Sequence, residues 1–382
     1  MRILIFSPYY PPHIGGLESH ADEFNKHLSQ RGVDITTFTP HLPEHTPEKE
    51  VPYNRVEILR FPSFELIPNY PFPKFWKGNF WKCWHRIENQ KYDVVISRTR
   101  FFFTSLMAKR YARKKNIPWI HIEHGSDFAK FNGMAKTLLG KWYDQTIGAF
   151  VLRQADYVIA NSRASVAFVK SLSEKDASLI YRGYEMEHSF PQNEIPKQEK
   201  IKDTIRILFV GRLIDGKGVA DLIGALGKIP PQNFSCLIVG DGPERKKLER
   251  LSKKLVLESR VSFLGHLPHQ KVLSLLRTAH IFVNPSYTEG LPTSVVEAAL
   301  ARLAIVATNV GGTPEVITGK NDGFLIPAGN VGMLQEKIQF FLEHPEIREQ
   351  FGQNAYAEVH QKFNWHSSIQ KYLDVFQTFI KK

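Results

Sequence analysis

The sequence predicts an α/β protein made of two doubly wound, Rossmann-like domains. Short β-branched and apolar runs alternate with amphipathic stretches of helical length along nearly the whole chain, which is typical of βαβ units and parallel sheets. The alternation lapses around residues 188–204, where the chain is polar and loses its periodicity. A length of 382 residues also exceeds what one hydrophobic core usually supports.

We therefore expect an N-terminal domain over 1–190, a linker over 191–204 and a C-terminal domain over 205–362. The strands expected in the first domain are 2–7, 33–39, 93–97, 118–122 and 157–160. Those expected in the second are 206–210, 234–239, 261–264, 281–284 and 304–308. The segment 363–382 places apolar residues at helical spacing, so we expect a final helix that docks back on the N-terminal domain.

The bulk composition indicates a folded protein with an anionic partner. Hydrophobic residues at 42% and charged residues at 23% are near the globular average, and the formal net charge is +12. The apolar stretch 3–6 is too short for a signal-peptide core, and no apolar run is long enough to span a bilayer, so we expect a soluble or peripheral protein. Cys83 and Cys236 lack metal-ligand spacing and fit a reducing cytoplasm.

The first candidate motif follows the first strand. Gly15 and Gly16 precede Glu18 and open a helix running to about Gln30. Glycines at this place let backbone N–H groups approach an anion at the positive end of the helix. A simple tight turn of an α/β protein would look the same.

The second domain opens with Gly-Arg-Leu-Ile-Asp-Gly-Lys-Gly over 211–218, directly after a strand. This run nearly spells a Walker A loop, but Gly218 stands where the magnesium-binding hydroxyl should be, which disfavours an NTPase. Arg212 and Lys217 at the carboxyl end of a strand instead predict a diphosphate site without a protein-bound metal.

The stretch 284–299 reads as a strand end, a loop and the start of a helix. Pro292 suits the first helical turn, so Glu289 lies in the loop and Glu297 further along the helix. The exposed N–H groups over 291–294 would form an anion site. One carboxylate can accept hydrogen bonds from sugar hydroxyls and the other from a ribose, although a glutamate near a helix start also simply favours the helix dipole.

The run His-Ile-Glu-His-Gly-Ser-Asp over 121–127 follows a strand of the first domain. Its histidines and carboxylates do not have the His-Glu-x-x-His spacing on a helix that a zinc site of this kind needs. We expect no metal here, and we expect His124 to point toward a ligand.

These motifs together resemble the group 1, family 4 class of retaining glycosyltransferases, which have the GT-B architecture of two Rossmann-like domains facing a cleft. The Glu-x7-Glu pair of Glu289 and Glu297 is the most specific motif, and the resemblance covers nearly the whole chain. One departure is the run Arg-Gly-Tyr-Glu over 182–185, where the family commonly has Asn-Gly-Val-Asp.

The resemblance implies a role for each motif. Gly16 would donate its N–H to the diphosphate of a nucleotide-sugar, while Arg212 and Lys217 neutralise the diphosphate as it leaves. Glu297 would hold the ribose, and Glu289 would bind the transferred sugar. The further residues implied are His124, which would contact that sugar from the other domain, Gly265 and His266 beside the base, and the donor-binding residues Gly15, Gly211, Gly290, Leu291, Pro292 and Thr293.

Residues 74–115 form a basic aromatic segment, in which twelve Lys and Arg stand against two acidic residues, with three of the six tryptophans, Trp76, Trp81 and Trp84. Aromatic residues interleaved with cations predict contact with an anionic membrane surface. The alternative is a helix with a solvated basic face and tryptophans in the core. No nucleic-acid-binding motif is present, so we expect no nucleic-acid partner.

The predicted activity is transfer of a sugar, with retention, from a UDP- or GDP-type nucleotide-sugar to a saccharide acceptor. We expect a lipid-linked acceptor in envelope polysaccharide biosynthesis, no cofactor, and a cytoplasmic protein that is peripheral at the inner face of the membrane. Two alternatives stay open. One is a glycosyltransferase that makes a soluble glycoside, and the other is a catalytically inactive basic adaptor that binds membrane or nucleic acid.

Overall fold

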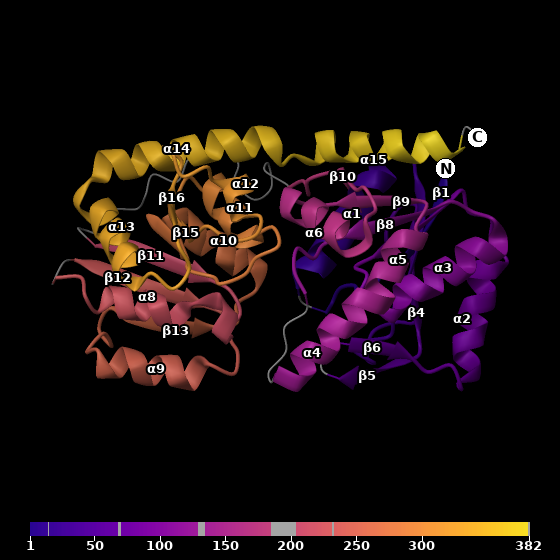
Figure 1. Ribbon diagram of the computed structural model, residues 1–382, viewed down its shortest axis with the longest axis horizontal. Helices are drawn as coiled ribbons and strands as arrows, with labels where there is room; N and C mark the ends of the chain where they lie inside the picture. The colour runs from indigo at the N-terminus through magenta and orange to yellow at the C-terminus, as the bar shows by residue number, and fades with distance from the viewer. Residues whose placement is uncertain (14, 68–69, 129–133, 185–203, 231–232, 381–382) are drawn as a thin grey trace. The chain divides into compact units, whose positions relative to one another are not determined.

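The computed structural model describes residues 1–13, 15–67, 70–128, 134–184, 204–230 and 233–380. It divides the chain into two compact units, Met1–Gly183 with Trp365–Lys382, and Tyr184–Asn364 (Figure 1). The chain thus changes unit at residue 184 and again at residue 365, rather than at 190 and 362. The expected linker lies outside the described residues except for its last position, Thr204.

The first unit is built on an eight-stranded sheet of order β10-β9-β8-β7-β1-β2-β4-β3, in which β3 alone is antiparallel to its neighbour among the described strands. Its strands are β1 (Arg2–Phe6), β2 (Asp34–Pro40), β3 (Lys49–Tyr53), β4 (Val56–Phe61), β7 (Val94–Arg98), β8 (Trp119–Glu123), β9 (Tyr157–Ala160) and β10 (Ser178–Leu179). A separate antiparallel pair consists of β5 (Ser63–Ile67) and β6 (Tyr70–Pro73).

Helices cover both faces of this sheet. They are α1 (Gly16–Gln30), α2 (Gly78–Glu88), α3 (Phe103–Lys115), α4 (Met134–Tyr143), the π-helical η1 (Asp144–Gly148), α5 (Ala149–Gln154), α6 (Arg163–Ser173) and α15 (Trp365–Ile380). Successive residues of a strand point to opposite faces. Accordingly, Ile3 and Ile5 of β1 pack in the cluster that contains α1 and α15, whereas Leu4 and Phe6 pack with α2, α3 and α5.

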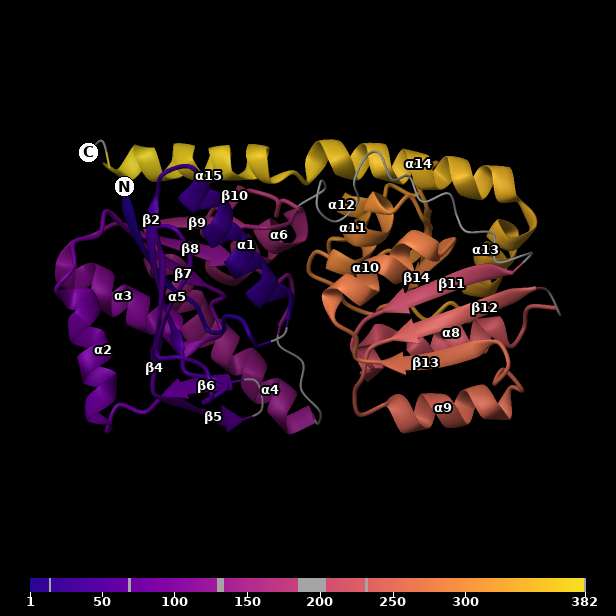
Figure 2. The ribbon, with the colours of Figure 1, turned by 180° about the vertical axis from the view of Figure 1, so that it is seen from behind.

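The final helix α15 completes the core of the first unit. Trp365, Ile369, Tyr372 and Phe376 are buried in the same cluster as Ile3. The Tyr372 ring lies edge-on to the Phe24 ring of α1, with centroids 4.9 Å apart. The last segment of the chain therefore belongs structurally to the first unit (Figure 2).

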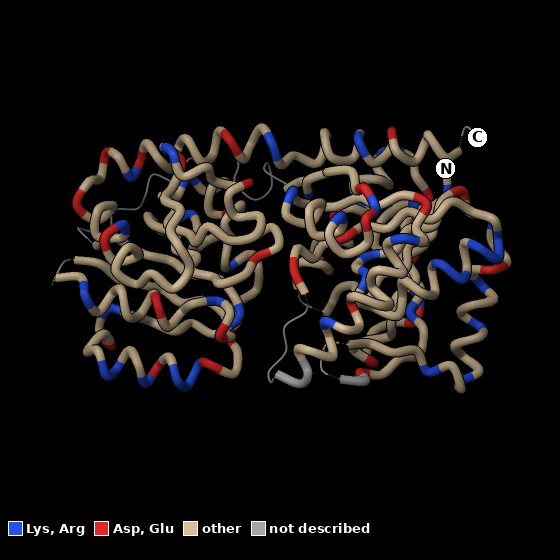
Figure 3. The backbone as a smooth tube through the Cα atoms, in the orientation of Figure 1, with Lys and Arg blue, Asp and Glu red and all other residues tan. Residues whose placement is uncertain are grey.

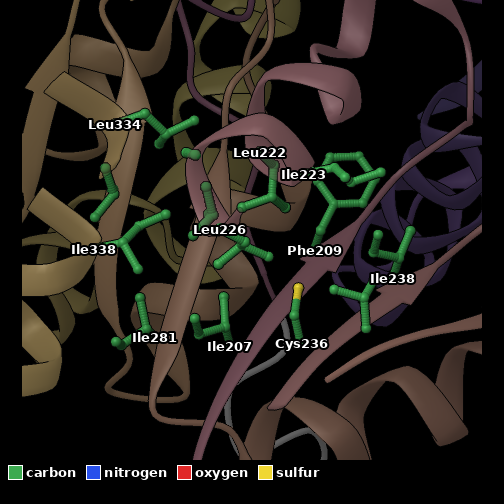
Figure 4. Packing of buried hydrophobic residues seen from close by; sticks show 14 of the residues in the cluster. Ile207, Phe209, Leu222, Ile223, Leu226, Cys236, Ile238, Ile281, Leu334 and Ile338 are labelled. Atoms are coloured by element: carbon green, nitrogen blue, oxygen red, sulfur yellow. The ribbon is translucent and has the colours of Figure 1, made fainter. Parts of the chain in front are cut away.

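The second unit contains a six-stranded parallel sheet of order β13-β12-β11-β14-β15-β16. Its strands are β11 (Ile205–Val210), β12 (Phe234–Val239), β13 (Val261–Gly265), β14 (Ile281–Asn284), β15 (Ala304–Thr308) and β16 (Phe324–Ile326). Its helices are η2 (Asp215–Lys217, 3-10), α8 (Val219–Leu226), α9 (Arg245–Lys254), α10 (His269–Thr278), α11 (Thr293–Leu300), α12 (Thr313–Val316), α13 (Val331–Glu343) and α14 (Pro345–Lys362). Ile207, Phe209, Leu222 and Ile338 pack between sheet and helices (Figure 4).

The predicted fold class is confirmed, and each of the ten expected strands is present within one residue of its expected bounds. Each sheet has one point where the strand order reverses. In the first unit it lies at β1, between β2 and β7, and in the second unit it lies at β11, between β12 and β14. Ligands of open α/β sheets bind beyond the carboxyl ends of strands at such points. No helix in the described part of the chain is both long and apolar enough to cross a membrane.

Candidate functional site

Two loops meet at the switch point of the second unit. One follows β11 and carries Arg212 and Lys217, and the other follows β14 and carries Glu289. The loops touch backbone to backbone, because a Cβ on Gly218 would lie 2.0 Å from the Pro285 carbonyl oxygen and Gly218 has a φ of +64°. Glycine is therefore required where the Walker A pattern has a hydroxyl residue.

Lys217 and Glu289 form an ion pair at this junction. The Lys217 Nζ lies 2.6 Å from Glu289 Oε1, and the Asn284 amide nitrogen lies 3.4 Å from the same oxygen. Both side chains are largely buried, with 22% of Lys217 and 10% of Glu289 exposed. The structure thus brings together a cation predicted to meet a diphosphate and a carboxylate predicted to meet a sugar.

Arg212 is the second residue after β11, at the start of the same loop. It is exposed, and no described carboxylate forms an ion pair with it. The backbone of the preceding Gly211 packs directly against Gly240, which has a φ of +133°. A Cβ on Gly240 would lie 1.8 Å from the Gly211 carbonyl oxygen. The guanidinium is therefore free to bind an anion bidentately while its backbone is held in place.

Glu297 lies on α11, whereas Glu289 lies in the loop that precedes this helix. Pro292 is the N-cap rather than a first-turn residue, and α11 begins at Thr293. The Glu297 carboxylate is 3.1 Å from Nε2 of His269, the first residue of α10. Gly265 ends β13 and His266 begins the connection to α10, so the residues predicted for ribose and base belong to neighbouring elements.

Gly311 and Gly312 pack against the backbone of the Glu289 loop. The sequence analysis did not predict this pair as part of the site. The Gly312 N–H donates to the Gly290 carbonyl over 2.7 Å. A Cβ on Gly311, where φ is +51°, would lie 1.7 Å from the Glu289 carbonyl oxygen. The signal available in the sequence was a Gly-Gly dipeptide just before the Thr-Pro start of a helix.

In the first unit, the switch point places Gly15 at the N-cap of α1 and Gly16 at its first position. Glu18 in the first turn accepts from His13 Nδ1 over 2.6 Å. Arg182 donates to the Gly16 carbonyl oxygen over 3.1 Å and to Glu23 over 3.0 Å. Arg182, where the sequence departs from the family pattern, therefore supports the start of α1.

His124 follows β8 and is held by a relay of polar groups. Its Nδ1 lies 3.4 Å from the Asn161 amide nitrogen, and the Asn161 oxygen accepts from the Ser165 hydroxyl over 3.2 Å. An amide with its oxygen so occupied presents its N–H₂ to Nδ1, which leaves the ring hydrogen on Nε2. The Nε2 atom is buried and has no partner among the described residues.

His124 is kept neutral by its surroundings. Burial, followed by the nearby Arg98 guanidinium, lowers the pKa of His124 to about 3. Arg98 itself is fully buried, with Nη1 2.6 Å from His20 Nδ1, and burial lowers the pKa of Arg98 to about 10. The rings of His20 and His124 lie 4.9 Å apart. A neutral imidazole with a free N–H is a hydrogen-bond donor for a ligand oxygen rather than a charge.

The other members of the 121–127 run have structural roles. Glu123 accepts the backbone N–H groups of His124 and Gly125 at 2.9 Å and 2.7 Å, and it pairs with Arg100 at 3.1 Å. Burial opposes ionisation of Glu123, but Arg100, His121 and the Gly125 N–H together outweigh burial and lower the pKa of that carboxyl. His121 is buried and contacts Ser97 and Glu123. Within the described ranges, no three His, Cys, Asp or Glu side chains are grouped to hold a metal.

Comparisons with known proteins show the family to which the chain belongs. Residues 14–188 match the family Glycosyltransferase Family 4, and residues 191–358 match Glycosyl transferases group 1. An uncharacterized glycosyltransferase of Methanocaldococcus jannaschii is 35% identical over 100% of this chain and 99% of its own length. The gpi3 subunit of the Schizosaccharomyces pombe phosphatidylinositol N-acetylglucosaminyltransferase is 26% identical over 94% of this chain and 76% of its own.

Among solved structures, Anabaena HepE in complex with UDP-glucose has the same fold. The TM-score is 0.76 at 21% identity, over 99% of this chain and 100% of that one. Both halves of the chain thus match one enzyme class, and a relative above 30% identity matches over the full length. The chain therefore belongs to the group 1, family 4 glycosyltransferases of GT-B fold.

Proposed function

We propose that the enzyme transfers a sugar from a nucleoside-diphosphate sugar to a lipid-linked saccharide, with retention of anomeric configuration. The observation that carries the donor class is the Lys217–Glu289 ion pair, with Arg212 exposed on the same loop. A nucleotide-sugar presents a diphosphate directly bonded to a sugar. A cation and a carboxylate in contact match those two neighbouring groups.

The proposed reaction needs no enzyme nucleophile. The acceptor hydroxyl oxygen bonds to the anomeric carbon on the face from which the diphosphate departs, and the hydroxyl proton leaves with the diphosphate oxygen. Arg212 and Lys217 stabilise the charge that develops on that oxygen, and the N–H of His124 donates to the sugar. Such prepositioned donors and cations are the main source of catalysis when the leaving group is good.

A uridine nucleotide is the donor we favour over a guanosine nucleotide, since HepE was solved with UDP-glucose. A lipid-linked acceptor is favoured by the phosphatidylinositol named for the Schizosaccharomyces pombe relative. A soluble acceptor is the alternative. With a lipid-linked acceptor, the enzyme would work at the inner face of the membrane, in the synthesis of an envelope polysaccharide.

The basic aromatic segment supports membrane contact less broadly than its composition indicates. Trp76 and Trp81 are exposed, but Trp84 is buried. Half of the twelve cations are buried or paired with carboxylates, namely Lys74, Arg86, Arg98, Arg100, Arg113 and Lys114. The remaining cations lie on or next to α2 and α3, and Figure 3 shows Lys and Arg spread along these helices. The exposed start of α2, with Lys77 and Lys82, is the part of the segment that fits a lipid surface.

A thermal-shift screen of nucleotide-sugars tests the donor class. A ligand that binds only the folded state at about 100 times its Kd adds about 2.7 kcal/mol of stability. We expect UDP-sugars to raise the melting temperature with or without a chelator, and the corresponding free sugars to leave it unchanged. If no nucleoside-diphosphate sugar stabilises the protein and none is hydrolysed, the proposed function is wrong.

The two donor carboxylates should separate nucleotide binding from sugar binding. Glu297→Ala should weaken binding of free UDP, because the partner proposed for Glu297 is the ribose. Glu289→Gln, which removes the charge but keeps the shape, should leave free UDP affinity nearly unchanged and reduce discrimination between UDP-sugars. Calorimetric titration measures both, with the exposed Glu258→Ala of the same unit as control. Equal losses of UDP affinity in the two variants would contradict this division.

A further inference from the structure

The continuous helix formed by α4, η1 and α5 presents large apolar side chains to solvent. Leu138, Leu139 and Trp142 of α4 are 61%, 65% and 58% exposed, and Phe150 of α5 is 42% exposed. Spacings of three and four residues place the first three side by side on the helix surface. We call these four residues the α4 face. Exposed apolar residues gathered in this way mark a contact surface rather than ordinary surface scatter.

Two cations lie beside the α4 face. Lys141 is exposed within it, and the Lys109 ammonium lies 3.9 Å above the Phe150 ring. Between residues 137 and 154 the sequence contains one carboxylate, Asp144, which is buried and ion-paired to Arg100 at 2.9 Å. The Thr146 hydroxyl donates to the Trp142 carbonyl oxygen over 2.8 Å, so this polar group is already satisfied. Little polar desolvation would oppose entry of this face into an interface.

Packed aromatic side chains connect the α4 face with the exposed tryptophan at the start of α2. The Tyr143 hydroxyl lies 3.0 Å from that of Tyr70 on β6. On the paired strand β5, the Phe64 ring packs 5.9 Å from the Phe72 ring and 5.7 Å from the Trp76 ring. Figures 1 and 2 show α4, β5, β6 and the start of α2 along one edge of the first unit. The two exposed surfaces therefore lie along the same edge of the first unit.

We propose that the α4 face is the main membrane-insertion surface of this protein, and that its partner is an anionic lipid bilayer. Leucine and tryptophan enter the headgroup boundary, while lysines beside them meet lipid phosphates, which is the composition of interfacial helices. A protein partner would have to place carboxylates opposite Lys109 and Lys141, whereas an anionic bilayer presents negative charge over its whole surface. The proposal rests on the proposed function only in that it places the acceptor at a membrane.

Vesicle co-sedimentation tests the proposal with the full-length protein. The probe is vesicles of phosphatidylglycerol and phosphatidylcholine, compared with phosphatidylcholine alone. The double variant Leu138→Glu/Leu139→Glu should lower the bound fraction at least about tenfold, because it removes inserted side chains and adds charge that anionic lipid repels. The control is Val256→Glu, which changes an apolar residue of the second unit that is 76% exposed and should bind as the unaltered protein does.

Brominated lipid gives a second, independent readout. Bromine on the upper acyl chain should quench part of the tryptophan fluorescence, and Trp142→Phe should remove most of the quenched fraction. Trp76→Ser/Trp81→Ser should lower binding by a smaller factor than the leucine variant. Binding that survives Leu138→Glu/Leu139→Glu, or that is lost only in the α2 variant, would overturn the proposal.

Two controls separate membrane insertion from misfolding and from dimerisation. Melting temperature and UDP-sugar binding without vesicles should be unchanged in the leucine variant, because both substituted side chains lie on the surface of the first unit. If UDP-sugars fail to bind any variant, the proposed function fails while the lipid result stands. If light scattering shows a dimer that the leucine variant dissociates, and vesicles bind neither form, the α4 face is a contact between two copies and the membrane proposal is wrong.

Discussion

Replacing Lys217 with alanine is expected to lower the turnover number by about two to three orders of magnitude. The ammonium is fixed against Glu289 before any ligand arrives, so it is placed to meet developing negative charge without reorganisation. Loss of one such preorganised group typically costs about 2.7–4 kcal/mol in the transition state. Single-turnover hydrolysis of a UDP-sugar measures the effect without knowledge of the acceptor. Arg212→Ala should have a similar effect, and the exposed Lys246→Ala is the matched control.

The ion pair suggests an alternative role for Lys217, which is to hold Glu289 in position without contacting the diphosphate. This alternative can be tested. If this were its whole contribution, the double variant Lys217→Met/Glu289→Gln would be no slower than Glu289→Gln alone. If Lys217 neutralises the diphosphate, the double variant is slower and also binds UDP more weakly. Near-normal turnover in folded Lys217→Ala and Arg212→Ala would remove the diphosphate role from this loop.

Substituting Gly311 with alanine should damage the donor site although Gly311 is not one of the residues expected to bind the donor. Its positive φ is costly for alanine, and the added Cβ would lie 1.7 Å from the Glu289 carbonyl oxygen, so the Glu289 loop must move. We expect a loss of at least about 2 kcal/mol in the free energy of unfolding, or a shifted loop with low turnover. Urea denaturation and single-turnover kinetics distinguish these two results.

The control for this substitution is Gly224→Ala in α8. There the added Cβ would have only an ordinary contact, 3.6 Å from a Val331 methyl group. Alanine in a helix interior is favoured over glycine by about 1 kcal/mol, so this variant should keep or gain stability. A Gly311→Ala protein that is as stable and as active as Gly224→Ala would show that the Glu289 loop tolerates displacement.

The central strands were predictable because buried parallel strands are nearly continuous apolar runs. Strand β11, for example, reads Ile-Arg-Ile-Leu-Phe-Val. The strands that were not predicted are β3, β4, β5, β6, β10 and β16. Of these, β3 and β6 are short and contain proline, as in Lys-Glu-Val-Pro-Tyr and Tyr-Pro-Phe-Pro. Proline and charge weaken a strand pattern, and such strands form at a sheet edge or in a separate hairpin.

For the site, the sequence located the loops after β11 and β14 but not what holds them. Periodicity places the two strands, and the motifs over 211–218 and 284–299 that follow them contain Lys217 and Glu289. Their ion pair joins positions 72 residues apart, and the pairing of Arg98 with His20 joins positions 78 apart. No local spacing encodes these contacts. They follow from which strands become neighbours at the switch point of each sheet.

The docking of α15 has a consequence for the order in which the protein can fold during synthesis. The second unit is continuous in sequence, so its core can close as soon as residue 364 has left the ribosome. The first unit begins 183 residues earlier but has an open apolar face until Ile369, Tyr372 and Phe376 are made. The half of the enzyme that is synthesised first is therefore completed last. Until that segment is available, the apolar surface around Phe24 and Ile3 stays uncovered and is open to aggregation.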